Sequence, residues 1–323
     1  MTNTIHSIVV DGLSFALPLF IIAIGGIYSE RSGVVNLALE GLLGFGAFTG
    51  GLFVAATAGY FAAASNAPMY LSFLIAAAGG ALFATLHAVL SIKFHANQVI
   101  SGVVVNIVAV ALTGFLTSTL NALFFGSPSV KFMLKTSPRW TVPVLSDIPV
   151  LGAVFTNFYP FELIILLVAL FMWYLLYRTR FGMHVRAAGD NPQALEGAGI
   201  DVARVRFIAV LISGAMSGIG GMAFAYSIST NFSPAVFFGG GFIAIAALIF
   251  GNWQILPTLL ACLIFGFARS SAYALVLRLN ADASVIDLAM ITPYLITLLL
   301  LVFFGKTNRA PRALGEIYDK SKR

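Results

Sequence analysis

Repeated apolar runs of about 20 residues, nearly free of charged side chains, are the feature that most limits the fold of this chain. A helix of that length matches the hydrocarbon thickness of a bilayer. Because lipid offers no hydrogen-bond partners to the backbone, spanning segments of this kind form helices. The sequence therefore predicts an all-α, polytopic transmembrane helix bundle of about 9–10 spans. The expected spans lie near 7–27, 34–58, 69–91, 98–120, 158–177, 206–228, 237–251, 256–277 and 285–304.

The composition excludes a soluble globular fold. Hydrophobic residues make up 59% of the 323 residues and charged residues only 9%, whereas about a quarter of the residues in a soluble domain are charged. No segment is both polar and long enough to form a soluble domain. Residues 1–323 are therefore expected to form a single transmembrane domain.

Glycine and proline predict that some spans are broken or re-entrant. The chain has 31 glycines and 12 prolines, which are tolerated in transmembrane helices where neighbouring helices pair the freed backbone groups. The glycine-rich second run, 34–58, is long enough to be interrupted, which would raise the number of spans from nine to ten. The seventh run, 237–251, is short and follows a triple glycine, which favours a half-helix or a re-entrant segment.

The basic residues orient the bundle. If the N-terminus is outside, thirteen of the 18 lysines and arginines fall in inner segments and four in outer ones, with Arg269 inside a span. Cytoplasmic loops of membrane proteins carry such an excess. We therefore expect the N-terminus outside and the C-terminus in the cytoplasm. On this orientation, the segment 121–157 is an external lid or docking loop, 178–206 is the longest cytoplasmic loop and 305–323 is a short cytoplasmic tail.

The segment 178–206 contains the signals of a short helix. The sequence Asp-Asn-Pro at 190–192 is a good helix start, because Asp or Asn caps and proline suits the first helical position. Glu196 is expected in the early turns, where its charge suits the helix dipole. Gly199 offers an end. These residues predict a helix at about 192–198 along the membrane face, and an ordinary surface connector explains them equally well.

Five motifs are spread over most of the chain: SERSGVVNLALEG (29–41), VISGVVVN (99–106), RAAGDNPQALEGAGI (186–200), SGAMSGIGG (213–221) and RALGEIYDK (312–320). The segment 186–200 is similar to the coupling loop of the permeases of ATP-binding-cassette importers, in the branch that carries sugars, branched-chain amino acids and nucleosides. The other four motifs resemble those of the nucleoside permeases in that branch. The resemblance implies a transport subunit of the bacterial cytoplasmic membrane rather than an enzyme.

The resemblance also implies partners on separate chains. These are an ATPase that holds ATP and magnesium, a second related permease in a heterodimer, and an extracytoplasmic substrate-binding protein. No cofactor on this chain and no nucleic acid is implied. The short helix would sit in a groove of the ATPase and transmit its closure to the spans. The residues expected to form this coupling element are Gly189, Asp190, Asn191, Pro192, Ala194, Glu196 and Gly199.

Asn36 and Glu40 are polar residues within an apolar run. Their spacing of four predicts that both lie on one helical face and point into the bundle. A carboxylate at the membrane centre costs about 2.5–3.5 kcal/mol on insertion scales, so it needs a partner or a wet cavity. Three uses of Glu40 stay open: contact with substrate, a structural hydrogen-bond anchor, and solvation near the cytoplasmic mouth. Asn106 is a further candidate: it could hydrogen-bond a neighbouring helix or line the substrate pathway.

Other intramembrane residues suggest packing rather than chemistry. Arg269 lies one turn before Tyr273, and Glu40 is one acid with which it could pair. The two G-x-x-x-G pairs, 46/50 and 214/218, are typical of close helix packing. The four histidines lack metal-ligand spacing, and Gly305-Lys306-Thr307 lacks the first glycine of a phosphate loop. We therefore expect no catalytic or metal site.

Three functions remain to be compared. An importer permease for nucleosides leads, and the same class for a ribose-like sugar or a branched-chain amino acid comes next. An ion-driven secondary transporter is disfavoured because few ionisable residues lie within the spans, with Glu40, Arg269 and Asp287 as the candidates. The short helix within 178–206 discriminates between these classes, because an ion-driven carrier has no use for it.

Overall fold

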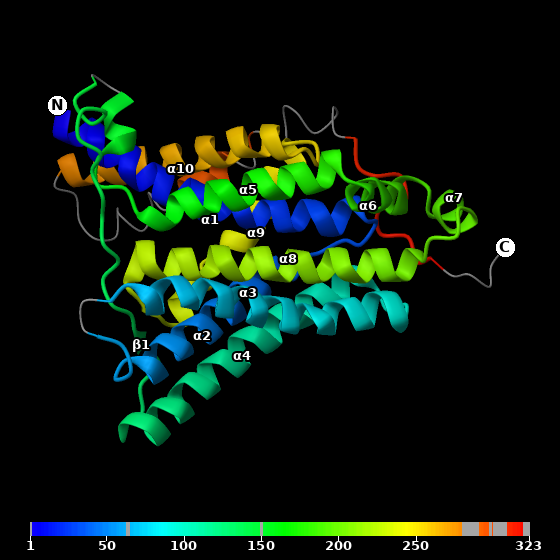
Figure 1. The fold of residues 1–323 in the computed structure, drawn as a ribbon, viewed down its shortest axis with the longest axis horizontal. Coiled ribbons are helices and arrows are strands. Elements are labelled where there is room, and N and C mark those ends of the chain that lie inside the picture. The colour runs from blue at the N-terminus through cyan, green and yellow to red at the C-terminus, as the bar shows by residue number, and fades with distance from the viewer. Residues whose placement is uncertain are drawn as a thin grey trace.

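The computed structural model describes residues 2–62, 65–148, 151–279, 291–296, 299 and 309–318. Long helices run side by side along one axis and form a bundle (Figure 1). Within the described residues, seven helical segments are long and apolar enough to cross a membrane. They are built on α1 (Thr2–Arg31), α2 (Leu39–Thr57), α3 (Ala67–Ala88), α4 (Gln98–Phe125), α5 (Pro160–Arg178), α8 (Val202–Phe224) and α10 (Ile255–Arg278).

The expected all-α bundle is confirmed, and the seventh expected run is indeed a short helix. This helix, α9 (Gly240–Phe250), has only 11 residues and cannot span a bilayer alone. Short π-helical segments, Val89–Lys93 and Ala225–Ser229, extend α3 and α8. The expected last span, 285–304, lies mostly outside the described residues.

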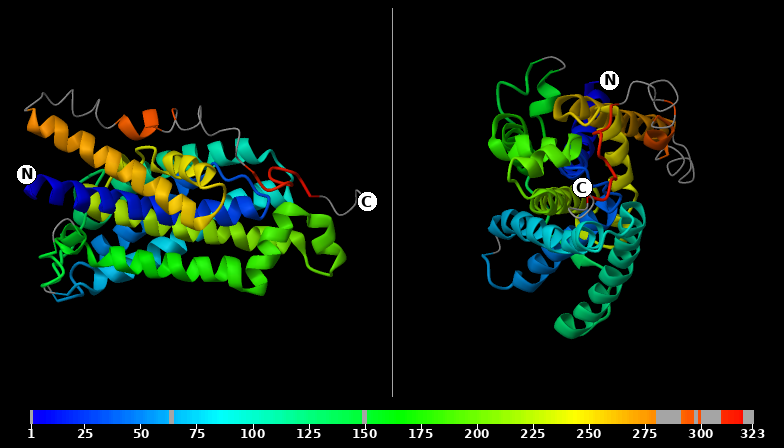
Figure 2. Two further views of the ribbon diagram at one scale, coloured as in Figure 1. Left: turned by 90° about the horizontal axis from the view of Figure 1, so that it is seen from above. Right: turned by 90° about the vertical axis from the view of Figure 1, so that its right-hand side faces the viewer.

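Two groups of connecting segments lie at opposite ends of the bundle. The N-terminus and the segment after α4 lie at one end (Figures 1 and 2). There β1 (Phe132–Met133) pairs antiparallel with β2 (Asn231–Phe232), and 3-10 helices form at Leu151–Phe155 and Pro234–Val236. The other end carries α6 (Arg180–Asp190), α7 (Pro192–Gly197) and the described part of the C-terminal tail. The segments 121–157 and 178–206 are thus on opposite sides, as their charges predict.

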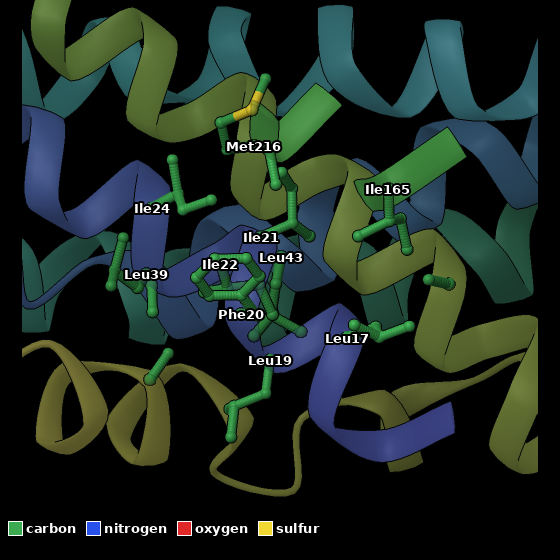
Figure 3. Packing of buried hydrophobic residues seen from close by; sticks show 14 of the residues in the cluster. Leu17, Leu19, Phe20, Ile21, Ile22, Ile24, Leu39, Leu43, Ile165 and Met216 are labelled. Carbon is green, nitrogen blue, oxygen red and sulfur yellow. The ribbon is translucent and has the colours of Figure 1, made fainter. Parts of the chain in front are cut away.

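Helix α1 forms the centre of the bundle. In its most apolar stretch 78% of the residues are buried, against 28% in α4. Figure 3 shows Leu19, Ile21 and Ile22 of α1 packed with Leu43 of α2 and Met216 of α8. Helix α4 runs diagonally along the edge of the bundle (Figure 1) and exposes many large apolar side chains. In a bilayer that edge faces an apolar solvent, so its exposure has no hydrophobic cost.

Glycines allow α2, α3 and α8 to touch backbone to backbone. A Cβ added to Gly218 would lie 2.1 Å from the carbonyl oxygen of Ala76, and one added to Gly46 would lie 2.3 Å from Gly218 Cα. One turn away, a Cβ on Gly214 would lie 2.3 Å from the carbonyl oxygen of Gly80. The prediction of close packing at the two G-x-x-x-G pairs is confirmed. Small residues are needed here because lipid supplies no hydrophobic drive and van der Waals contact must hold the helices together.

The substitution Gly218→Val should separate α2, α3 and α8. Overpacking of a tight interior typically costs about 1–3 kcal/mol, occasionally more, and here the obstacle is backbone rather than a movable side chain. We expect a clear fall in the melting temperature of the detergent-purified protein. The matched control is Gly114→Val in α4, where an added Cβ meets nothing within 4 Å. Equal melting temperatures for the two variants would contradict the packing described here.

Candidate functional site

The segment between α1 and α2 enters the bundle without forming a helix. Helix α1 ends at Arg31, Gly33 adopts a positive φ of 95°, and α2 begins only at Leu39. The prediction that Asn36 and Glu40 share one helical face is therefore wrong, because Asn36 precedes the helix.

Side chains of other helices replace the helical hydrogen bonds of this segment. Gln98 Oε1 accepts a hydrogen bond from the Val35 amide at 2.7 Å, and His87 Nε2 lies 3.0 Å from the Val35 carbonyl oxygen. These tertiary partners pair the backbone of Val35 in a non-helical stretch inside an apolar environment, where unpaired backbone groups would be costly. The helical spacing of polar residues could not reveal them.

Asn36 joins this segment to α8. Its side chain is fully buried, and its Nδ2 donates to Ser213 Oγ at 2.9 Å. Its Oδ1 accepts from the Ala38 amide at 3.0 Å, which is a local turn that leads into α2. Both ends of the amide thus have a protein partner.

Asn106 performs the same task from α4. Its Oδ1 accepts from the Gly41 amide at 2.7 Å, and its Nδ2 donates to the Leu37 carbonyl oxygen at 2.8 Å. Gly41 permits this approach, because a Cβ there would lie 2.9 Å from Asn106 Oδ1. Asn106 therefore bridges the turn before α2 and the first turn of α2.

Glu40 caps the short helix α9 from a different helix. Its Oε1 accepts from the Gly239 amide at 2.8 Å and its Oε2 from the Gly241 amide at 2.6 Å. The residue before α9 is Gly239, with a φ of 88° and no side chain to cap the helix itself. A carboxylate at a helix N-terminus also interacts favourably with the helix dipole. Of the three uses open for Glu40, this geometry favours the structural anchor; contact of Asn36, Glu40 or Asn106 with substrate stays a prediction.

Arg269 has a different neighbour from the one suggested by the sequence. Both oxygens of Glu40 bind α9, and the Arg269 guanidinium lies over the ring of Phe15, 4.5 Å from its centroid. The suggested pair between Arg269 and Glu40 is therefore wrong.

The predicted short helix is present as α7 at the end of the bundle away from the N-terminus. Asn191 Oδ1 caps it by accepting from the Ala194 amide at 3.0 Å, and Pro192 is its first residue. Gly199 follows with a φ of 80°. The helix buries Pro192 and Leu195 and exposes Ala194.

Other residues of this segment differ from expectation. Residues 180–190 form a further helix, α6, where only a loop was expected. Glu196 lies in the second turn of α7, and its Oε2 accepts a hydrogen bond from the Val202 amide at the start of α8, at 3.3 Å. Asp190 ends α6 and is exposed. The Glu196 carboxylate thus caps the N-terminus of the next helix, α8.

Arg206, in α8, connects the end of α1, helix α6 and the tail by hydrogen bonds, a role that the sequence alone did not predict. Its side chain is 3% exposed and donates to three carbonyl oxygens. They belong to Ser32 after α1, at 3.0 Å, Glu316 of the tail, at 2.8 Å, and Ala188 of α6, at 3.3 Å. The only sequence signal is a second arginine at the start of an apolar run.

The tail completes the junction. The Ala313 amide donates to the Gly189 carbonyl oxygen at 2.7 Å, and the Gly315 amide donates to that of Gly33 at 3.0 Å. A Cβ on Gly189 would lie 2.3 Å from the Arg31 carbonyl oxygen, so α6 packs directly on the end of α1. The helices α6 and α7 are thus firmly connected to the spans.

No group of three or more histidine, cysteine, aspartate or glutamate side chains lies together as a metal site would require within the described part of the chain.

Removal of the Glu40 carboxylate should destabilise the protein. In Glu40→Ala the buried Gly241 amide and the partly buried Gly239 amide lose their partner, and an unpaired buried group costs about 1–3 kcal/mol. Glu40→Gln keeps one acceptor oxygen, so its melting temperature should fall less than that of Glu40→Ala. Asp147→Ala, at an exposed position, serves as the control. If the Glu40→Ala protein has the same melting temperature as the wild type, the cap adds nothing to stability.

Comparison with known proteins shows the same membrane-protein class. The sequence model described as "branched-chain amino acid transport system / permease component" matches residues 8–304. The nucleoside ABC transporter permease protein NupC of Lactococcus lactis subsp. cremoris is 39% identical, over 100% of this chain and 99% of that protein. The guanosine ABC transporter permease protein NupQ of Bacillus subtilis is 40% identical, over 99% and 98%. The guanosine permease protein NupP of the same bacterium is 26% identical, over 81% and 73%. The chain therefore belongs to the family of branched-chain amino acid transport system permease components.

Proposed function

We propose that this chain is the permease subunit of an ATP-binding-cassette importer that takes up nucleosides. The observation that carries the proposal is the capped helix α7, held at one end of a bundle whose full-length relatives are named nucleoside and guanosine permeases. An ordinary connector has no need for a capped helix whose neighbour, α6, is tied to α1, α8 and the tail. An ion-driven carrier has no partner against which such a helix could work.

The surface of α7 suits insertion into a groove of an ATPase. Its exposed residues are small or uncharged: Gln193, Ala194, Gly197 and Ala198. Close approach needs such residues, whereas bulky or charged ones would hold a partner away. Movement of the ATPase would pass from α7 to α6, and from there through the hydrogen bonds of Arg206 to the ends of α1 and α8. In this way ATP binding would change the packing of the spans.

The proposed partners follow from this role. The α7 end faces the cytoplasm and an ATPase that binds ATP and magnesium, and the N-terminal end faces an extracytoplasmic binding protein. The basic residues near α6 and α7 support this orientation. The chain itself performs no chemistry and has no cofactor. The similarity to both NupP and NupQ of one bacterium supports a heterodimer with a second, related permease in the bacterial cytoplasmic membrane.

Purification of the tagged protein from its native membranes in mild detergent tests this proposal. Mass spectrometry should identify an ATPase and a second permease, and membranes that contain all the subunits should take up guanosine when ATP is present. Uptake of ribose or leucine instead would replace the substrate and keep the importer. A protein that is purified alone, under conditions that preserve a known importer complex, would contradict the importer itself.

The substitution Ala194→Glu should abolish ATP-driven uptake and leave the fold intact. A carboxylate on the exposed face of α7 would be buried against the ATPase without a partner, which is strongly unfavourable. We expect loss of the ATPase from the purified complex and an unchanged melting temperature of the permease. Ser127→Glu adds the same charge at an exposed site after α4, at the other end of the bundle, and should retain uptake. Normal uptake by Ala194→Glu would exclude α7 as the coupling element.

A further inference from the structure

Two adjoining cavities lie between α1, α10 and the π-helical segment after α8. Their volumes are about 350 and 310 Å³, and both are lined by Phe15, Ile228 and Arg269. Small-molecule pockets typically have volumes of about 300–1,000 Å³, so either cavity has the size of a ligand site. Because they share three residues, we treat them as one space, here called the Arg269 cavity.

The Arg269 cavity lies in the half of the bundle that contains the N-terminus. Asp11 and Phe15 are in the first half of α1, and Arg269 and Tyr273 are in the second half of α10. Phe238, two residues before α9, and Ile243, in its first turn, line its other side. The helix that Glu40 caps therefore forms part of the wall, and Trp253, three residues after its end, contacts Glu30 and Arg31 at the end of α1.

The lining is unusually polar for a position inside apolar helices. A cation within a transmembrane helix is costly and commonly marks a substrate pathway. Arg269 is accompanied by the Asp11 carboxylate, with which it interacts electrostatically, and by the hydroxyl groups of Ser270 and Tyr273. The aromatic rings of Phe15 and Phe238 add flat apolar surface.

We propose that the Arg269 cavity is a substrate-binding station for nucleosides on the path through this permease. A base can stack on a guanidinium plane, and its carbonyl and ring nitrogen atoms can accept hydrogen bonds from Arg269. The Asp11 carboxylate can accept hydrogen bonds from ribose hydroxyls. A carboxylate and a guanidinium in one cavity suit a ligand without net charge that both donates and accepts hydrogen bonds, as a nucleoside does, and the Asp11 carboxylate repels a free phosphate. The inference rests on the proposed nucleoside transport and adds the place where the substrate binds.

A cysteine-protection experiment on the assembled transporter tests this inference. The chain has one native cysteine, Cys262, which is buried. The variants Ser227→Cys and Ser229→Cys form a matched pair, because both serines are half-buried in the same π-helical segment and only Ser227 lines the cavity. Each is reconstituted with its ATPase and partner permease and treated with a small thiol reagent during turnover.

The expected result is that guanosine-loaded binding protein slows modification of Ser227→Cys several-fold relative to the empty binding protein. Modification of Ser229→Cys should be unchanged. If the transporter imports guanosine and Ser227→Cys is not protected, the cavity is not the station, although the proposed function stands. If ribose or leucine is imported and guanosine is not, both the nucleoside proposal and this inference fail.

A second variant measures the contribution of Arg269. Arg269→Gln should raise the KM of guanosine uptake several-fold, with a smaller change in the maximal rate, and Arg269→Lys should recover only part of the loss because ammonium cannot stack as a plane. Arg278→Gln, at the exposed end of α10, is the control. An unchanged KM in Arg269→Gln would contradict a role of the guanidinium in binding.

Discussion

The architecture depends on buried side chains that complete the hydrogen bonding of irregular backbone inside an apolar medium. Two segments are not helical: residues 32–38, which start at the end of the bundle that carries α6 and the tail, and the residues up to Gly239 that lead into α9. In lipid-like surroundings their amides and carbonyls need partners from the protein. Asn106 hydrogen-bonds the backbone of the first segment, and Glu40 hydrogen-bonds the backbone of the second. A span that would otherwise be continuous can therefore be broken, and the break provides the short helix that lines the Arg269 cavity.

These polar residues also connect helices that are far apart in the sequence. Glu40 joins α2 to α9, Asn36 joins the start of α2 to α8, and Asn106 joins it to α4. The glycine contacts between α2, α3 and α8 act in the same region and bring the backbones close enough for such short side chains to reach. Small residues and buried amides thus depend on each other, since neither would be useful if the helices were farther apart.

The sequence predicts the local features well and the tertiary ones poorly. Hydropathy locates the spans, and Asn191, Pro192 and Gly199 locate α7, because caps and turns are determined by neighbouring residues. The partners of Glu40, Glu196 and Arg206 lie on other elements, so their spacing along the chain carries no information about them. The helical face assigned to Asn36 and Glu40 was wrong for this reason: long-range hydrogen bonds outweighed the periodicity of the apolar run.

The hydrogen bonds between the C-terminal tail and the rest of the bundle have a consequence for biosynthesis. Ala313 and Gly315 bind the carbonyl groups of Gly189 and Gly33, and Arg206 binds Glu316. Gly33, Gly189 and Arg206 belong to parts of the chain that leave the ribosome long before the tail does. The junction that supports α6 and α7 can therefore close only after residues 313–316 have been synthesised. A chain that stops before Ala313 would lack this support, so this end of the bundle is completed only when that late segment has been made.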